Sequence, residues 1–264
     1  MRWLRPLALI AALLLPGIVQ AQDEGDQGRI VRFLETQLSD GARTVTIRGF
    51  RGALSSTAEM DLLTIADEDG VWLTLENAQL SWSRTALLRG ALQVDQLSAE
   101  RLEVARRPVI EDTGPDLPSA EAMPFALPDL PVSIAVDRVA IDRVSLGADI
   151  LGEALELTIA GSARLAGGDG RADLDIRRLD GPRGLFTLDA SYGNATRDLN
   201  LSLLAEEAEG GIVTTRLGLP DAPAIRLSVE GAGPIDNFTA DVALESDGEP
   251  RLTGQIQTAL EAET

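Results

Sequence analysis

Apolar residues recur at every second position over most of the chain, which is the period of a β-strand with one apolar face. The longest clean run is 155–165, where odd positions are apolar or small and even positions include Glu156 and Arg164. Shorter runs with the same period are 45–47, 71–82, 92–94, 102–104, 132–136, 174–176, 186–192, 199–203, 225–229, 238–244 and 252–256. Turns rich in glycine and aspartate separate them. The pattern predicts a mainly β chain that forms an antiparallel sheet with one apolar and one polar face.

One segment near the N-terminus has a helical period instead. Between Arg29 and Leu38, the apolar residues on one helical face are Ile30, Val31, Leu34 and Leu38. Ser39-Asp40-Gly41 then ends the run. This spacing predicts one short amphipathic helix directly ahead of the first strand. We expect its apolar residues to cap the start of the sheet.

The strand pattern is interrupted at three places. After Glu76-Asn77 the apolar phase moves by one residue, which indicates a β-bulge. The segment Pro108–Pro131 holds six prolines and no strand period, so we expect a crossing or linker there. Two similar pentads follow, Asp137–Ile141 and Asp142–Leu146. Two interpretations of this repeat remain open: the pentads mark successive rungs, or the duplication arose by chance.

A short helical turn is predicted between two strand runs. Ser83 is placed to cap a turn that passes through Leu87-Leu88 and ends at Gly90. Trp72 and Trp82 lie on the run that leads into this turn. We therefore expect both indoles near the turn, in structural roles.

The first 21 residues have the layout of an export signal. Arg2 and Arg5 precede the apolar run Leu7–Leu15, and small residues at Val19 and Ala21 precede an acidic stretch. The apolar run is shorter than the roughly 20 residues that a membrane-spanning helix needs. We expect export to the bacterial periplasm, with residues 1–21 either cleaved as a signal peptide or retained as an inner-membrane anchor. The rest divides into 22–107 (helix and first strands), 108–131 (the crossing) and 132–264 (a β-repeat).

Composition removes most catalytic chemistry. The 264 residues include 42 acidic and 23 basic side chains, for a net charge of −19, and neither cysteine nor histidine occurs. These counts exclude disulfides, Cys/His metal sites and Cys or His nucleophile systems. Strong acidity argues against nucleic acid, and the acidic turns lack the ligand spacing of calcium loops. We predict a non-enzymatic protein without a cofactor or metal.

A longer stretch resembles a known family. The residues that carry the resemblance are Phe33-Leu34-Glu35, Val45–Ser56, Leu63–Leu75, Leu80–Gly90, Leu97–Glu100 and Arg107-Pro108. In this order and spacing, residues 29–108 are similar to the N-terminal region of TamB proteins of the alphaproteobacterial type. Beyond residue 130 the similarity is only a general β-repeat texture.

The resemblance implies a periplasmic component of the translocation and assembly module, related to AsmA-like and bridge-like lipid transfer proteins. Such proteins have a long β-groove that supports outer-membrane protein assembly, protein secretion and phospholipid transport between membranes. The implied partners are phospholipid acyl chains, the inner membrane at the N-terminus and an Omp85-type outer-membrane protein. Family members are several times longer, and their C-terminal domain engages the outer-membrane partner. We therefore expect this chain to be a truncated groove without that partner-binding region.

Two folds satisfy the alternation. In a β-sandwich, typical of an exported binding module or adhesin, two aliphatic faces pack on each other. In a groove, one elongated curved sheet leaves its aliphatic face to acyl chains. Alternation alone favours the sandwich; together with the resemblance, it favours the groove, which is the predicted fold. The residues predicted to line it are Val71, Leu73, Leu75, Val132, Ile134, Leu155, Leu157, Ile159, Leu174, Ile176, Leu201 and Leu227.

Overall fold

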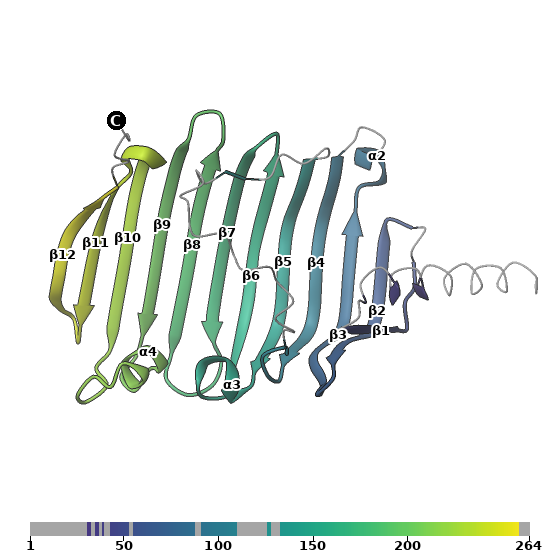
Figure 1. Ribbon diagram of the computed structural model, residues 1–264, viewed down its shortest axis with the longest axis horizontal. Coiled ribbons are helices and arrows are strands. Elements are labelled where there is room, and N and C mark those ends of the chain that lie inside the picture. Colours follow the sequence, from purple (N-terminus) through teal and green to yellow (C-terminus); the bar gives the residue numbers. More distant parts are fainter. Residues whose placement is uncertain are drawn as a thin grey trace, which may run out of the picture.

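Twelve strands form one open, curved sheet, in which the spatial order of the strands follows their order in the chain (Figure 1). The computed structural model describes residues 31–32, 35–36, 39, 43–52, 55–87, 91–109, 126–127 and 133–258. The mainly β prediction is confirmed. The predicted segments 22–107 and 132–264 contribute to the same sheet, because β4 pairs with β5.

The strands are long and their connections are mostly short turns. Their bounds are β1 (Thr44–Arg48), β2 (Thr57–Asp67), β3 (Gly70–Trp82), β4 (Ala91–Val104), β5 (Ser133–Leu146), β6 (Leu155–Ala166), β7 (Asp169–Arg178), β8 (Gly184–Gly193), β9 (Asp198–Glu207), β10 (Ile225–Pro234), β11 (Thr239–Ser246) and β12 (Glu249–Gln257). The short helices in the connections are α2 (Arg84–Leu87), α3 (Ala148–Leu151), α4 (Ile212–Arg216) and the 3-10 helix η1 (Ile235–Asn237). Helices α3 and α4 lie at one end of the strands, here called the α3 end, and α2 lies at the opposite, α2 end (Figure 1).

One neighbouring pair of strands is parallel. All strand pairs are antiparallel except β4 and β5, so the prediction of a wholly antiparallel sheet is wrong at this pair. Strand β4 finishes at the α3 end, whereas β5 begins at the α2 end. The chain between them must therefore travel the length of the strands, as parallel pairing requires. Residues 110–125 and 128–132, the greater part of the proline-rich segment predicted as a crossing or linker, lie outside the described residues.

The duplicated pentads lie one after the other within β5, so they are not rungs of separate strands. In the pairing of β5 with β6, the register shifts between Val136 and Val139, and again between Ile141 and Val144. Each shift passes over an Asp-Arg pair, at 137–138 and 142–143. Two unpaired residues per pentad keep the apolar residues of both pentads on the same face of the sheet. The duplicated Asp-Arg pairs therefore allow the apolar residues of β5 to stay on one face of the sheet.

The phase change predicted at Asn77 extends over four neighbouring strands, β2 to β5. In one row of paired residues, Leu75 lies between Leu63 and Leu102. In the next apolar row, Ala78 lies between Met60 and Ala99. Each strand advances three residues between these two rows, so the pairing continues and the apolar face is kept. Asn77 has a positive φ of 49°, a conformation that asparagine tolerates better than most residues. The irregularity is thus matched between strands instead of being one extra residue in β3.

The start of the predicted turn after β3 is present as α2, whereas its predicted end at Leu88 and Gly90 lies outside the described residues, and one tryptophan lies elsewhere. The Ala86 N–H donates to the Ser83 carbonyl at 3.2 Å and contacts Ser83 Oγ at 3.4 Å, at the start of α2. Trp82 directly precedes this turn and is half-buried. The expectation for Trp72 is wrong, because it lies ten positions from Trp82 in the same strand, which amounts to roughly 30 Å along β3. Trp72 lies near the α3 end.

The first edge of the sheet is covered by side chains from the preceding segment. The outward N–H groups of Val45 and Ile47 in β1 donate to Ser39 Oγ at 2.9 Å and to Glu35 Oε1 at 2.8 Å. These bonds satisfy donors that an edge strand otherwise leaves open. Of the predicted helix over 29–38, the described residues are helical: Val31, Arg32, Glu35 and Thr36. Its predicted packing residues Ile30, Leu34 and Leu38 lie outside the described residues, as do residues 1–21.

A buried ion pair fixes the chain where it leaves β4. The guanidinium of Arg106 donates both to Asp67 Oδ2, at 2.8 Å, and to Asp67 Oδ1, and the Val109 N–H donates to Asp67 Oδ2 at 2.8 Å. The side chain of Asp67 is only 3% exposed. Hydrogen bonding by Arg106 is the main reason why the pKa of Asp67 lies well below its ordinary value, and it outweighs the opposing effect of burial.

We expect Asp67→Asn to destabilise the protein at neutral pH, because Arg106 then loses its charged partner. A depressed pKa means that the carboxylate stabilises the fold fully above about pH 4 and loses this effect as the pH falls further. The difference in unfolding free energy between wild type and variant should therefore be constant from pH 7 to pH 5 and shrink below pH 4. Urea unfolding at each pH measures it, with the exposed Asp69→Asn as control. A difference that does not change with pH would refute the assignment.

Candidate functional site

A continuous row of paired apolar residues crosses eleven of the twelve strands. From β2 to β12, the row is Met60, Ala78, Ala99, Ile141, Ile159, Ile176, Phe186, Ala205, Leu227, Leu244 and Leu252. Residues that pair across neighbouring strands point to the same face of a sheet. Their side chains therefore form one apolar surface over the width of the sheet, here called the apolar face. The alternate residues, such as Asp173 and Asp175 in β7, point to the opposite face.

No second layer packs on the apolar face within the described ranges. The extensive contacts of each strand are those with its neighbours in the single sheet. Leu157 and Ile159 accordingly remain half-buried, and Leu252 is 55% exposed. In a sandwich, residues at these positions face a second sheet and become fully buried. The sandwich interpretation of the alternation is therefore wrong, and no second sheet covers the apolar face within the described residues. The face is covered locally: α3 and α4 lie against its α3 end, and Leu127 lies over Gly170, where a β-carbon would be 2.5 Å from Leu127 Cδ1.

Most residues predicted to line a groove come together on this face. By register, the ones that share it are Leu73, Leu75, Ile134, Leu155, Leu157, Ile159, Leu174, Ile176, Leu201 and Leu227. Val132 lies outside the described residues. Val71 pairs with Ala66 beyond a register shift at the end of the sheet and is 50% exposed, so it is not part of the continuous surface.

In the described central strands β5 to β10, two charged residues occupy positions on the apolar face, both at the α3 end. Arg178 in β7 pairs with Leu157, and Glu207 in β9 pairs with Ile225. A charged group on such a surface needs partners, because an unpaired buried charge is costly. Both side chains have them: the partners of Arg178 include the connection that carries α3, and those of Glu207 lie in α4.

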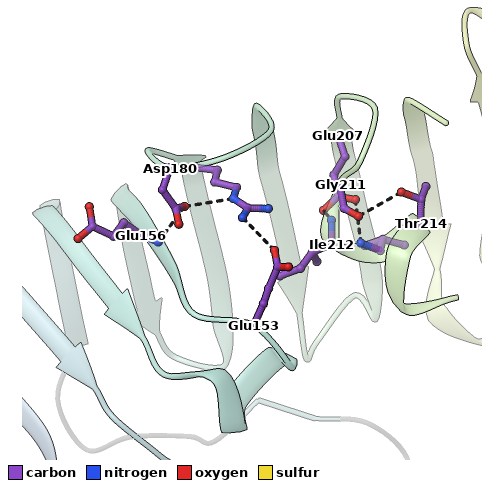
Figure 2. Close-up of polar contacts among 9 residues, drawn as sticks. Glu153, Glu156, Asp180, Glu207, Gly211, Ile212 and Thr214 are labelled. Carbon is purple, nitrogen blue, oxygen red and sulfur yellow. Dashed lines mark hydrogen bonds and ion pairs between the residues drawn. The ribbon is translucent and has the colours of Figure 1, made fainter. Parts of the chain in front are cut away.

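Arg178 is held by two carboxylates from neighbouring connections. Its Nη2 donates to Glu153 Oε1 at 2.9 Å, and its Nε donates to Asp180 Oδ1 at 3.1 Å. Asp180 also accepts the Glu156 N–H at 3.0 Å, as Figure 2 shows. Burial opposes ionisation of Asp180 and Arg178, but these bonds outweigh it, so the pKa of Asp180 is lowered and that of Arg178 is raised. Both groups are therefore ionised at neutral pH, and the α3–β6 connection is tied to β7.

Glu207 holds the start of α4 against the sheet. Its Oε2 accepts the Val213 N–H at 2.9 Å and its Oε1 accepts the Ile212 N–H at 3.2 Å, which satisfies two donors in the first turn (Figure 2). A β-carbon on Gly211 would lie 2.4 Å from Glu207 Oε2, so only glycine allows this close approach. Thr214 is fully buried and its Oγ1 donates to the Gly211 carbonyl at 3.1 Å. The α4 turn is thus fixed on the apolar-face side.

Helices α3 and α4 flank an open apolar pocket of about 210 Å³ at this end of the face. The floor is formed by residues of β6 to β10, among them Leu155, Leu157, Ile176 and Phe186, and the walls include Leu151 of α3 with Ile212 and Val213 of α4. The two helices are close to each other, since a β-carbon on Gly152 would lie 2.3–2.6 Å from atoms of the Arg216 guanidinium. The pocket is smaller than the roughly 300–1,000 Å³ typical of drug-sized ligands and is suited to part of an aliphatic chain.

Sequence reasoning found the face but missed the pocket. Helices α3 and α4 are four and five residues long, too short for a periodic apolar pattern to reveal. One signal was present: Arg178 and Glu207 break the apolar alternation at the same end of their strands. Charges at positions that the alternation assigns to an apolar face indicate a local partner.

The described part of the chain contains no cluster of acidic side chains arranged to hold a metal ion. Among its helices, none combines the length and apolar character needed to cross a bilayer. Comparison with known proteins gives no match to a family model, a curated protein or a solved structure. The geometry of the apolar face and the resemblance of residues 29–108 are therefore the two grounds for a functional conclusion.

Proposed function

We propose that the protein is a non-enzymatic lipid conduit whose apolar face holds phospholipid acyl chains. The observation that carries the proposal is the apolar row across eleven strands, on which no second layer packs within the described residues. Such a surface exposed to water is costly, and an acyl chain laid on it gains about 0.8 kcal/mol for each methylene buried.

The chemistry of the face suits acyl chains better than other apolar ligands. Aromatic residues make up only 3% of the sequence, so the face is almost entirely aliphatic and offers few stacking surfaces. An aliphatic surface binds by area and not by directed contacts. A flexible chain can therefore occupy it at many positions along the row, as a conduit requires. This property favours lipid over the specific ligand of an exported binding module.

The cellular setting is proposed from the resemblance to TamB proteins. It supports a periplasmic protein, associated with the bacterial inner membrane through its N-terminus. In that setting the apolar face would serve phospholipid transport between membranes and thereby outer-membrane protein assembly and secretion. An Omp85-type partner belongs to this proposal only for a longer chain that includes the partner-binding region.

Neighbouring residues of β7 provide a matched test. Leu174 lies on the apolar face and Asp173 on the opposite one, so the two positions differ in face but hardly in place along the strand. A photoreactive amino acid at position 174 should crosslink phospholipid in membrane-containing preparations, because acyl chains contact that face. The same group at position 173 should not crosslink lipid.

The crosslinked products separate the alternatives. Lipid at position 174 alone supports the conduit. Lipid at both positions indicates nonspecific membrane contact, and lipid at neither position refutes the proposal. Mass spectrometry of the crosslinked peptides identifies the adduct in each case.

A further inference from the structure

A second cavity adjoins the apolar pocket at the ends of β7 to β10. It has a volume of about 470 Å³ and is lined mainly by charged side chains. The two cavities share Arg178, Gly184, Leu185, Glu206, Glu207 and Ile225. An amphiphile with an acyl segment in the apolar pocket would therefore present its polar head to the charged cavity.

Most charges around the charged cavity already have partners. Arg226 pairs with Glu206, and Arg177 pairs with Asp175 of its own strand at 2.7 Å. Arg178 is held by Glu153 and Asp180. Glu207 accepts the two N–H groups at the start of α4.

Two oppositely charged residues of the cavity wall have no such partners. Arg183 and Glu209 are exposed, and neither side chain has a hydrogen bond or ion pair within the described residues. They lie in adjacent turns, because the Ala208 N–H donates to the Arg183 carbonyl at 2.8 Å. Among the residues that the structure describes, the cavity therefore offers one free cation and one free anion on neighbouring segments.

The surrounding charge disfavours a purely anionic ligand. When the partners Asp175, Glu153 and Asp180 are included, carboxylates outnumber guanidiniums around the cavity by two. The whole chain carries a net charge of −19. A head that bears a phosphate and no cation is repelled by this field, whereas an added ammonium group is attracted.

We infer that the charged cavity binds the head of a zwitterionic phospholipid, with the phosphate at Arg183 and the ammonium at Glu209. This inference rests on the proposed function, since it is the acyl chain that brings the head to the cavity. It adds a lipid selectivity that the apolar face alone does not supply. Arginine is suited to the phosphate because its guanidinium can form two parallel hydrogen bonds to phosphate oxygens.

The test offers the full chain equal amounts of phosphatidylethanolamine and phosphatidylglycerol with identical acyl chains, in mixed vesicles. Lipid that co-purifies with the protein is extracted and both classes are quantified. Wild type should enrich phosphatidylethanolamine roughly threefold to fivefold, the upper part of the range expected for an exposed charge pair. Glu209→Gln should abolish the enrichment, and Arg183→Gln should lower the binding of both lipids. Arg164→Gln, an exposed arginine at the α2 end, should change neither quantity.

The outcomes distinguish this inference from the proposed function. Bound lipid without enrichment overturns the head site and leaves the conduit standing. Enrichment that persists in Glu209→Gln also overturns it, and so does unchanged lipid binding by Arg183→Gln, because the contacts to the head then lie elsewhere. Absence of bound lipid in wild type overturns both. Thermal unfolding of the variants should match wild type, since both side chains are exposed.

Discussion

Replacing Gly147 by alanine is expected to destabilise the protein by about 1–3 kcal/mol, the cost of forcing an extra group into a filled space. Gly147 follows β5 and precedes α3, and its N–H donates to the Val104 carbonyl at 2.8 Å. A β-carbon there would lie 1.8 Å from the Ala105 carbonyl oxygen, which belongs to the backbone and cannot rotate away. The ends of the parallel strands β4 and β5 must separate to admit it.

A second glycine provides the control for this substitution. Gly254 in β12 also has no positive φ, but no atom lies within 4 Å of the position that a β-carbon would take there. Gly254→Ala should leave stability unchanged or raise it slightly, because alanine restricts the unfolded chain. Urea unfolding of both variants compares them directly. Equal stability of Gly147→Ala and wild type would contradict the close approach of the β4 and β5 ends.

Replacing Glu207 by alanine is expected to release α4 from the apolar face. The variant loses both acceptors for the Ile212 and Val213 N–H groups, and loss of a comparable helix cap costs about 0.5–2 kcal/mol. Amide hydrogen exchange over 212–217 should accelerate, because the turn opens more often. Exchange in the middle of β7 and β8 should not change.

The neighbouring Glu206 separates this effect from a general loss of negative charge. Glu206 points to the other face, where it pairs with Arg226, and the side chains are 35% and 51% exposed. An exposed pair contributes little, so Glu206→Ala should change stability by less than about 1 kcal/mol and leave exchange in α4 as in wild type. If Glu207→Ala left α4 equally protected, the proposed tether would be wrong.

The period of the sequence predicted the two faces because it repeats on most of the strands. In β6, Leu155, Leu157 and Ile159 alternate with polar residues, and the sheet places all three on the apolar face. Strand β2 was missed as a strand, because its apolar residues change phase between Met60 and Leu63 at the irregularity shared with Asn77. Alternation is a local signal, so a slip of phase hides a strand.

The direction of pairing and the number of layers could not be predicted in the same way. Alternation is the same for parallel and antiparallel strands, so the β4–β5 pair had no distinguishing pattern. An aliphatic face packed on a second sheet and one left open also need the same residues, such as Leu174 and Leu201. These properties depend on contacts between segments that are distant in the chain.

Only part of the candidate site could be predicted, because its face and its pocket depend on different kinds of contact. Residues of the apolar face follow from period two alone. The pocket depends on α3 and α4, which a few side-chain bonds tie to the sheet, among them those of Arg178 and Glu207. Such bonds join residues of different connections, and no spacing rule in the sequence encodes them.

The central claim is that one face of a single sheet contacts lipid, and photocrosslinking along the whole of β7 tests it most directly. The photoreactive group is placed in turn at positions 172 to 177, which alternate between the two faces. We predict lipid adducts at the even positions, 172, 174 and 176, and none at the odd positions. Protein-only adducts at the even positions, or lipid adducts without period two, would contradict this claim.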